Sequence, residues 1–245
     1  MSTFYERNIF IIFITTMDKF RIIENCKENT KCFIICGMWR SGLHCIVNDI
    51  ILHYNIQNNI NLLFRNDVKL CDYNNQQNNN NVFLFEDQFV MLQTKMNTQY
   101  NIIIIRDIYD NIISRIKRNT GWSKVDTLYL ETMNKILKEI LGITNNIPDK
   151  IVIDYNLYIS RSRCRYRISI LKQFGILNIK PFSKKIPHYG GGKTFRKHEK
   201  REDVIINSST YNLIKNNLEF IDLVKKYYKY DIIQKLDKHI QRVKG

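Results

Sequence analysis

The segment Gly37-Met-Trp-Arg-Ser-Gly42 places two glycines five positions apart after an apolar run, with Arg40 and Ser41 between them. Glycines at this spacing allow a turn whose backbone N–H groups converge, and a helix that begins there adds the positive end of its dipole. Phosphate and sulfate groups bind to such turns. The sequence therefore predicts an anion-binding loop, in which Ser41 either hydrogen-bonds the anion or caps the helix.

The residues after the second glycine distinguish this loop from that of nucleotide triphosphatases. There, Lys and then Ser or Thr bind the phosphates and Mg²⁺. Here Leu43 and His44 occupy those positions, and the cation lies inside the turn as Arg40. A guanidinium and backbone N–H groups can neutralise the charge on a leaving phosphate. The pattern thus favours group transfer without a metal.

A second pair of candidate anion ligands comes later in the chain. Arg106 directly follows the apolar run 101–105, and Ser114 lies eight residues further on, about two helical turns away. Both could therefore face one anion. Two alternatives stay open: Arg106 pairs with Asp107 or Asp110, and Ser114 is an ordinary helical serine.

Four apolar runs, each followed by a helical pattern, must position these residues. The predicted strands are Cys32–Cys36, Val82–Phe85, Asn101–Ile105 and Lys150–Asp154. The predicted helices are Ser41–Tyr54, Asp107–Arg118, Lys124–Leu141 and Ser162–Phe174, with Gly142 and Gly175 at helix C-termini. Strands that are apolar on both faces and alternate with helices indicate an α/β fold. We expect a parallel sheet flanked by helices, with ligands at the carboxyl ends of its strands.

The 245 residues fit a single domain. Within it, residues 1–30 form an N-terminal extension, and 210–245 are expected to form one or two amphipathic helices that close the domain. The Asn- and Gln-rich tract 74–81 and the segment 176–209, which holds Gly190-Gly-Gly192, are predicted loops.

Composition restricts the partners and the compartment. The chain has 38 basic and 23 acidic residues, a net charge of +15, which favours a polyanion such as a nucleic acid, an anionic membrane surface or a charged nucleotide. Six cysteines without a Cys-x-x-Cys pair favour a reducing compartment. We therefore expect a cytoplasmic protein. The abundance of Asn, Ile and Lys is compatible with a large virus or a protist as the source, and a viral protein would be expected in the virion or the host cytoplasm.

No apolar run reaches the length of a transmembrane segment. The apolar stretch Asn8–Thr15 is too short to span a bilayer, since a membrane helix needs about 20 residues. An extra edge strand is favoured there over a signal anchor, which remains the alternative.

Together the two motifs resemble those of the sulfotransferase superfamily that uses 3′-phosphoadenosine 5′-phosphosulfate (PAPS). In that family a Gly-x-x-Arg/Lys-Ser-Gly loop holds the 5′-phosphosulfate, and an Arg with a Ser eight residues later holds the 3′-phosphate. The sequence of the loop is similar to that of small sulfotransferase-domain proteins of microbial and viral genomes. The resemblance covers roughly residues 31–197. It implies a sulfotransferase-like, P-loop-type sheet. It assigns the donor to Gly37, Met38, Trp39, Arg40, Ser41, Gly42, Leu43, His44, Arg106 and Ser114.

The chain also departs from the family pattern. Leu43 replaces a side-chain donor to phosphate, and Ile108 stands where the closer subgroup has Pro. The late segment with Arg196 and Lys197 is similar to the family's loop over the 3′-phosphate, although basic loops are commonly just solvated.

Transfer of a sulfuryl group to a hydroxyl needs a base for the acceptor proton. In the family the base follows the strand between the two motifs, which favours Glu86 here, with Asp87 and His44 as the other candidates. Glu86 or Asp87 capping the next helix is the structural alternative. Tyr155 lies after the last strand and either lines the acceptor side or packs.

The sequence thus predicts an enzyme that moves a sulfuryl group from PAPS to a hydroxyl or amine, with a carbohydrate as the acceptor suggested by analogy. The products are the sulfated acceptor and 3′-phosphoadenosine 5′-phosphate. No metal and no specific nucleic acid are expected. Two alternatives stay open: a metal-dependent, P-loop kinase-like protein, and an inactive protein that binds a nucleotide or nucleic acid.

Overall fold

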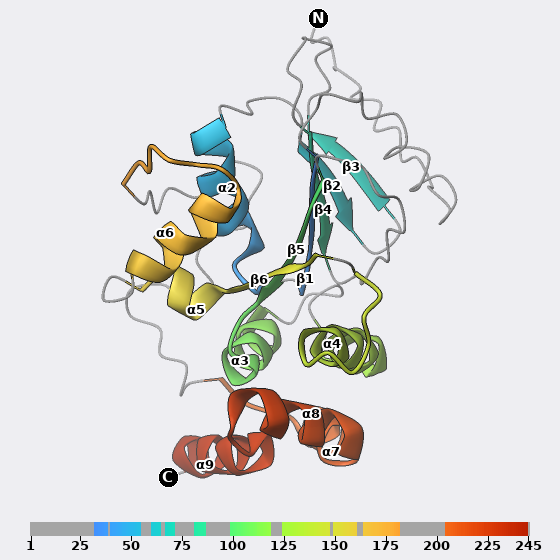
Figure 1. Cartoon of the computed structure of the whole chain (residues 1–245). Coiled ribbons are helices and arrows are strands. Elements are labelled where there is room, and N and C mark those ends of the chain that lie inside the picture. Colours follow the sequence, from blue (N-terminus) through green and yellow to red (C-terminus); the bar gives the residue numbers. More distant parts are fainter. Residues whose placement is uncertain are drawn as a thin grey trace, which may run out of the picture.

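The structure is a computed structural model that describes residues 32–38, 40–54, 60–64, 67–71, 81–86, 99–118, 124–147, 149–160, 164–181 and 204–244. Within these ranges a sheet carries helices on both faces, which confirms the α/β class (Figure 1). Several sequence predictions lie outside the described residues. These are the N-terminal edge strand, Trp39, Asp87, most of the Asn- and Gln-rich tract, and the late loop with Arg196 and Lys197.

The sheet has six strands in the order β3-β2-β4-β1-β5-β6. Their bounds are β1 Cys32–Gly37, β2 Ile60–Phe64, β3 Asp67–Cys71, β4 Asn81–Glu86, β5 Gln99–Ile105 and β6 Ile151–Asp154. The four predicted strands are confirmed as β1, β4, β5 and β6. All neighbouring strands pair in parallel except β2 and β3.

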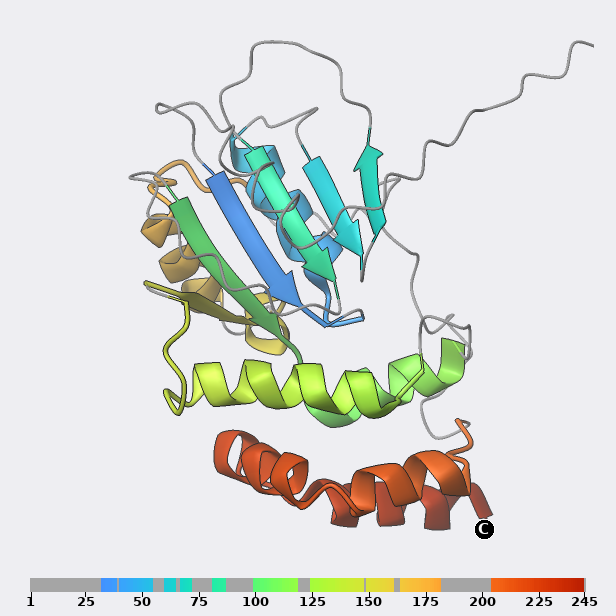
Figure 2. The same ribbon diagram turned by 90° about the vertical axis from the view of Figure 1, so that its right-hand side faces the viewer.

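The hairpin of β2 and β3 was not predicted, and it corrects the expectation of a wholly parallel sheet. In Figure 2 the arrow of β3 points opposite to those of β1, β2, β4 and β5. Each strand of the hairpin has five residues, and only the two residues 65–66 separate them. Such a short connection suits antiparallel strands, because a parallel pair would need a crossover of a dozen residues or more.

The helices are α2 Leu43–Tyr54, α3 Ile108–Arg118, α4 Thr127–Ile140, α5 Tyr155–Tyr158, α6 Cys164–Gln173, α7 Ser208–Lys215, α8 Leu218–Tyr228 and α9 Ile232–Lys244. The four predicted helices correspond to α2, α3, α4 and α6. Gly142 and Gly175 have φ of 70° and 76°, as glycines after helices commonly do. The C-terminal region forms three helices rather than one or two.

Alternating residues of the central strands divide the core into two parts. Ile102 and Ile104 of β5 face a cluster with α2 and α6, whereas Ile103 and Ile105 face a second cluster with α3 and α4. Burial of both faces explains why β5 reads as an unbroken apolar run.

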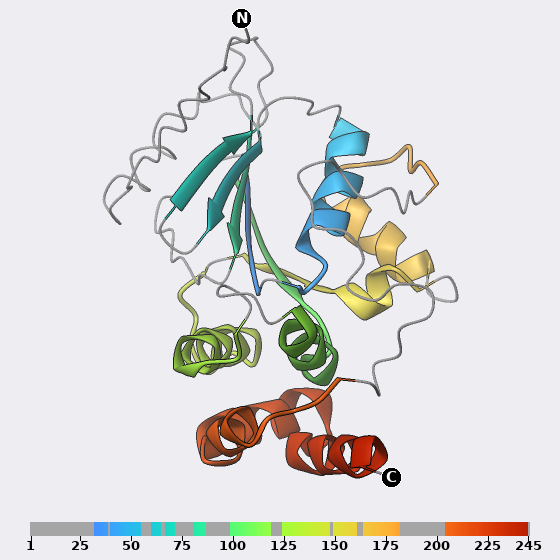
Figure 3. The same ribbon diagram turned by 180° about the vertical axis from the view of Figure 1, so that it is seen from behind.

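The C-terminal helices α7, α8 and α9 form a third layer outside α3 and α4 (Figures 1 and 3). Phe220, Leu223 and Val224 of α8 and Leu236 of α9 join the cluster that contains α3 and α4. As a result α3 is covered on both sides, and most of its residues are buried. In the described ranges no helix is both long and apolar enough to cross a membrane.

One buried carboxylate fixes the connection from α4 to β6. Glu139 has no exposed surface and accepts hydrogen bonds from the backbone N–H groups of Asn146 and Ile147, from Thr144 and from the Lys150 ammonium at 2.9 Å. Burial alone would raise the pKa of Glu139, but these bonds outweigh it and lower the pKa below 4.5.

Replacing Glu139 should therefore destabilise the protein in a pH-dependent way. We expect Glu139→Gln to lower the free energy of unfolding by about 2–3 kcal/mol at pH 7, because an amide oxygen cannot serve all these donors. A carboxyl with a lowered pKa in the folded state stabilises above its unfolded pKa, and this contribution is lost as the pH falls through the folded value. Urea unfolding at pH 7 and at pH 3 measures both effects.

The matched control is Glu131→Gln at an exposed position of the same helix, where we expect little change. A difference between wild type and Glu139→Gln that stays constant from pH 7 to pH 3 would contradict the assignment.

Candidate functional site

The predicted anion loop lies at the carboxyl end of β1, in the middle of the sheet. From β1 the chain passes to β2, β3 and β4 on one side and then crosses to β5 on the other. The helix after β1 packs on one face, and the helix after β5 packs on the opposite face. Open α/β sheets bind their ligands at this kind of switch point.

Side chains anchor the loop to both parts of the core. Met38 is 2 % exposed and joins the cluster with α3 and α4, whereas Leu43 is 1 % exposed and joins the cluster with α2. A Cβ on Gly37 would lie 2.7 Å from the carbonyl oxygen of Ile104, so glycine is needed for this close approach. Because the Leu43 side chain lies in the core, position 43 presents no side chain at the surface of the loop. The replacement of the family's phosphate donor by Leu43 therefore leaves the loop surface unchanged.

The backbone of the loop forms a tight turn. Ser41 N–H donates to the carbonyl of Met38 at 2.9 Å, and Arg40 has φ of 71° in the left-handed region. This conformation costs a residue with a side chain about 1–2 kcal/mol, so it persists only where its surroundings enforce it. Gly42, with φ of 88°, continues the turn into α2.

The N-terminus of α2 differs from those of the other helices. Every other helix whose preceding residue is described begins with an Asp or Asn side chain that accepts a backbone N–H of the first turn. These residues are Asp107, Asp126, Asp154, Asn207, Asn217 and Asp231. Before α2 stands Gly42, which has no side chain, and the first turn of α2 contains no acidic residue. The positive end of this helix therefore lies at the loop with no acidic side chain at its cap or in its first turn.

Ser41 supplies a second polar group at the same place. Its side chain is 1 % exposed, and within the described residues its Oγ has no hydrogen-bond partner. The hydroxyl therefore does not cap α2, and its bond to an anion stays a prediction. A buried hydroxyl without a partner costs about 1–3 kcal/mol. Such a group at an uncapped helix N-terminus is a donor suited to an anion.

Arg106 joins the second motif to the loop. Its Nη1 donates to the carbonyl oxygen of Arg40 at 3.0 Å, and its guanidinium lies 5.6 Å from the centroid of the Tyr155 ring. Asp107 accepts the N–H of Asp110 and lies 3.6 Å from the ammonium of Lys235. The structure thus brings the guanidinium of Arg106 to the backbone of Arg40.

Ser114 is placed differently from Arg106. It lies on α3 with no exposed surface. Like Ser41 it is buried, and its role beside Arg106 stays a prediction.

Two of the three candidate bases, Glu86 and His44, lie in the described residues. Glu86 is the last residue of β4, and its Cα is the register partner of Gly37. The two backbones are therefore neighbours at the carboxyl ends of β4 and β1. His44 is half-buried in the first turn of α2.

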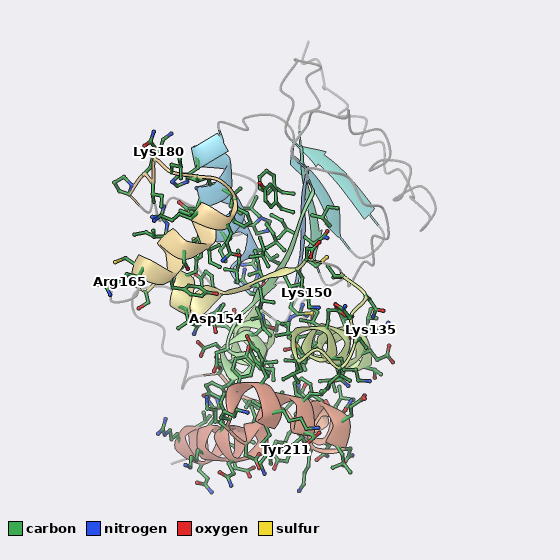
Figure 4. The ribbon with its side chains drawn as sticks, viewed as in Figure 1. Lys135, Lys150, Asp154, Arg165, Lys180 and Tyr211 are labelled. Atoms are coloured by element: carbon green, nitrogen blue, oxygen red, sulfur yellow. The ribbon has the colours of Figure 1, made fainter. Side chains whose placement is uncertain are left out.

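Tyr155 proves to be part of the loop's support. A Cβ on Gly42 would lie 2.1 Å from a carbon of the Tyr155 ring, so the ring packs directly on this glycine. Burial raises the pKa of Tyr155, and the nearby Cys45 adds to this, while Arg106 opposes it. Asp154, labelled in Figure 4, caps α5 by accepting the N–H of Leu157, and Tyr155 is the first residue of this helix.

A buried ion pair behind the loop was not predicted. Arg167 donates to both carboxylate oxygens of Asp49 at 2.7 and 2.9 Å, and the hydroxyl of Tyr158 donates to the same carboxylate. Arg165, by contrast, lies on the outer side of α6 (Figure 4). In the sequence, the available signal for this ion pair was Asp49, an isolated acidic residue within the apolar face of α2. The pair fixes α2, and with it the loop, against α6.

No family model, no curated protein and no solved structure matches the chain. In the part of the chain that the structure describes, His, Cys, Asp and Glu side chains form no group of three that could hold a metal ion.

The contact between Gly42 and Tyr155 can be tested by substitution. We expect Gly42→Ala to lower the free energy of unfolding by about 2–4 kcal/mol, because the left-handed backbone and the clash with the ring add. The control is Gly142→Ala, where φ is 70° and nothing lies within 4 Å. It should cost only about 1 kcal/mol. Denaturant unfolding of both variants gives the comparison, and equal losses would show that the ring does not restrict position 42.

Proposed function

We propose that this protein is a sulfotransferase that moves a sulfuryl group from PAPS to a hydroxyl or amine acceptor. The observation that carries the proposal is the buried hydroxyl of Ser41, without a partner among the described residues, at the uncapped N-terminus of α2. A phosphosulfate is a compact anion of the kind that such a group binds.

The residues around the loop fit the donor's charge. Ser41 Oγ and the N–H groups of the first turn of α2 would hold the 5′-phosphosulfate, with Arg40 neutralising it. Arg106, which contacts the loop, would hold the 3′-phosphate. Ser114, buried on α3, stays the proposed second ligand of the 3′-phosphate, with an ordinary helical serine as the alternative. Arg196 and Lys197 remain candidates for covering the 3′-phosphate.

The donor supplies a sulfuryl group on a phosphate leaving group. An acceptor oxygen or nitrogen forms a bond to sulfur while the bond from sulfur to the phosphate oxygen breaks, and the acceptor proton passes to a base. We propose Glu86 as the base, because its backbone is the register neighbour of Gly37 at the loop. The loop's donors stabilise the charge that develops on the leaving phosphate. The products are the sulfated acceptor and 3′-phosphoadenosine 5′-phosphate.

The kinase-like alternative requires a side chain after Gly42 that reaches the phosphates or their Mg²⁺. Leu43 is 1 % exposed in the core and cannot do so. This geometry favours a donor bound by backbone N–H groups, a hydroxyl and guanidinium groups.

Thermal unfolding with three ligands separates the functions. We expect 3′-phosphoadenosine 5′-phosphate to raise the Tm, because a ligand at about 100 times its Kd adds about 2.7 kcal/mol to stability. ATP with Mg²⁺ and a DNA oligomer should have smaller effects. Ser41→Ala should weaken bisphosphate binding about tenfold, since one charge-assisted hydrogen bond is lost, yet leave the unliganded protein as stable as wild type or slightly more stable.

The matched control is Ser169→Ala, which removes a hydroxyl bound to the Tyr166 carbonyl on α6. It should leave binding unchanged. Stabilisation by ATP with Mg²⁺ but not by the bisphosphate would refute the proposed donor. A loss of stability in unliganded Ser41→Ala would show that the hydroxyl has a structural role.

Binding and turnover should separate at two positions. Arg106→Ala should weaken bisphosphate binding, because a direct cation is lost. Glu86→Gln should spare binding and abolish sulfuryl transfer, because the amide cannot take the acceptor proton. Titration calorimetry and an acceptor screen with labelled donor measure the two effects. Full transfer by Glu86→Gln would remove Glu86 as the base and leave Asp87 and His44.

A further inference from the structure

The third layer of helices contacts the candidate site through one tyrosine. Tyr228, the last residue of α8, donates its hydroxyl to the carbonyl oxygen of Arg106 at 2.7 Å. Arg106 lies between β5 and α3, so this bond joins the C-terminal layer to the carboxyl end of a central strand. The two residues are 122 positions apart in sequence.

Neighbouring contacts hold the same turn. The hydroxyl of Tyr230 accepts the N–H of Tyr109 in the first turn of α3 at 3.3 Å. Lys235 of α9 lies 3.6 Å from Asp107 and 3.5 Å from the centroid of the Tyr230 ring. Burial raises the pKa of Tyr228 well above its ordinary value, so its hydroxyl keeps the proton that it donates.

From Arg106 the contacts continue into the loop. The guanidinium donates to the carbonyl of Arg40, and the N–H of the same peptide unit, that of Ser41, donates to Met38. The peptide between residues 40 and 41 is therefore hydrogen-bonded on both sides. Its orientation sets the direction in which the Ser41 side chain leaves the backbone.

We propose that Tyr228 is a positioning residue for the donor site: its bond to the Arg106 backbone fixes the Arg106 guanidinium and, through it, the peptide that carries Ser41. The ligand part of this proposal rests on the proposed function. Tyr228 touches no donor atom itself and acts through Arg106.

The same layer offers a matched control. The hydroxyl of Tyr211 on α7 donates to Asp237 on α9 at 2.6 Å, a bond that stays within the C-terminal layer (Figure 4). Tyr228→Phe and Tyr211→Phe each remove one tyrosine hydroxyl and its hydrogen bond from the same group of helices. Only the first removes a contact with Arg106.

The first measurement needs no ligand. Hydrogen–deuterium exchange of the full chain, followed by mass spectrometry on peptides that contain residues 37–46, reports the opening of the loop. We expect about fivefold faster exchange at these peptides in Tyr228→Phe and wild-type rates in Tyr211→Phe. A Tyr230→Phe variant, which loosens the same turn through Tyr109, should act in the same direction and serves if Tyr228→Phe fails to fold.

The second measurement is the affinity for 3′-phosphoadenosine 5′-phosphate. We expect Tyr228→Phe to weaken it about tenfold, and Tyr211→Phe to leave it unchanged. In an Arg106→Ala background Tyr228→Phe should have no further effect, because residues that act through one another are not additive. A general loss of stability would instead affect both backgrounds equally.

The outcomes separate the two proposals. Wild-type loop exchange in Tyr228→Phe overturns the positioning role, whatever nucleotide binds. If the wild-type protein does not bind the bisphosphate, the proposed function fails, while the exchange data still decide whether Tyr228 positions the loop.

Discussion

The hydrogen bond from Arg106 to the carbonyl of Arg40 connects the two halves of the candidate site. It holds a peptide unit whose first residue is in the left-handed region, and it joins the carboxyl ends of β1 and β5. Other contacts hold the chain on either side of this bond. Met38 and Leu43 enter separate parts of the core, Tyr155 covers Gly42, and the third layer holds the Arg106 backbone in place.

The loop combines several features that are unfavourable in the protein alone. Arg40 adopts a left-handed conformation, and Ser41 buries a hydroxyl without a partner among the described residues, at about 1–3 kcal/mol each. The other helices whose preceding residue is described have Asp or Asn caps at their N-termini, and Glu139 shows how fully a buried carboxylate is bonded. This contrast supports the proposal that the loop binds an anion.

The sequence was sufficient for the central strands and the helices after them, because long runs of Ile, Val and Phe mark strands buried on both faces. It missed β2 and β3, whose short and mixed sequences carry no clear period. It did not indicate that Ser114 would be buried, because helical spacing fixes which residues share a side but not what covers that side. The contacts of Tyr155 with Gly42 and of Tyr228 with Arg106 depend on how distant segments pack, which no local pattern encodes.

The candidate site depends on the third layer of helices as well as on the sheet. In a sheet with a single helix layer on each face, the turn after β5 would lie at the surface, and a long arginine there would lose considerable rotamer freedom on binding an anion. Here the backbone of Arg106 is bonded to Tyr228, and its guanidinium is bonded to the loop before any ligand arrives. Ordering the cation in advance lowers the entropy that binding must overcome. In the proposed site, the C-terminal helices would therefore preorganise Arg106, although they lie on the far side of α3.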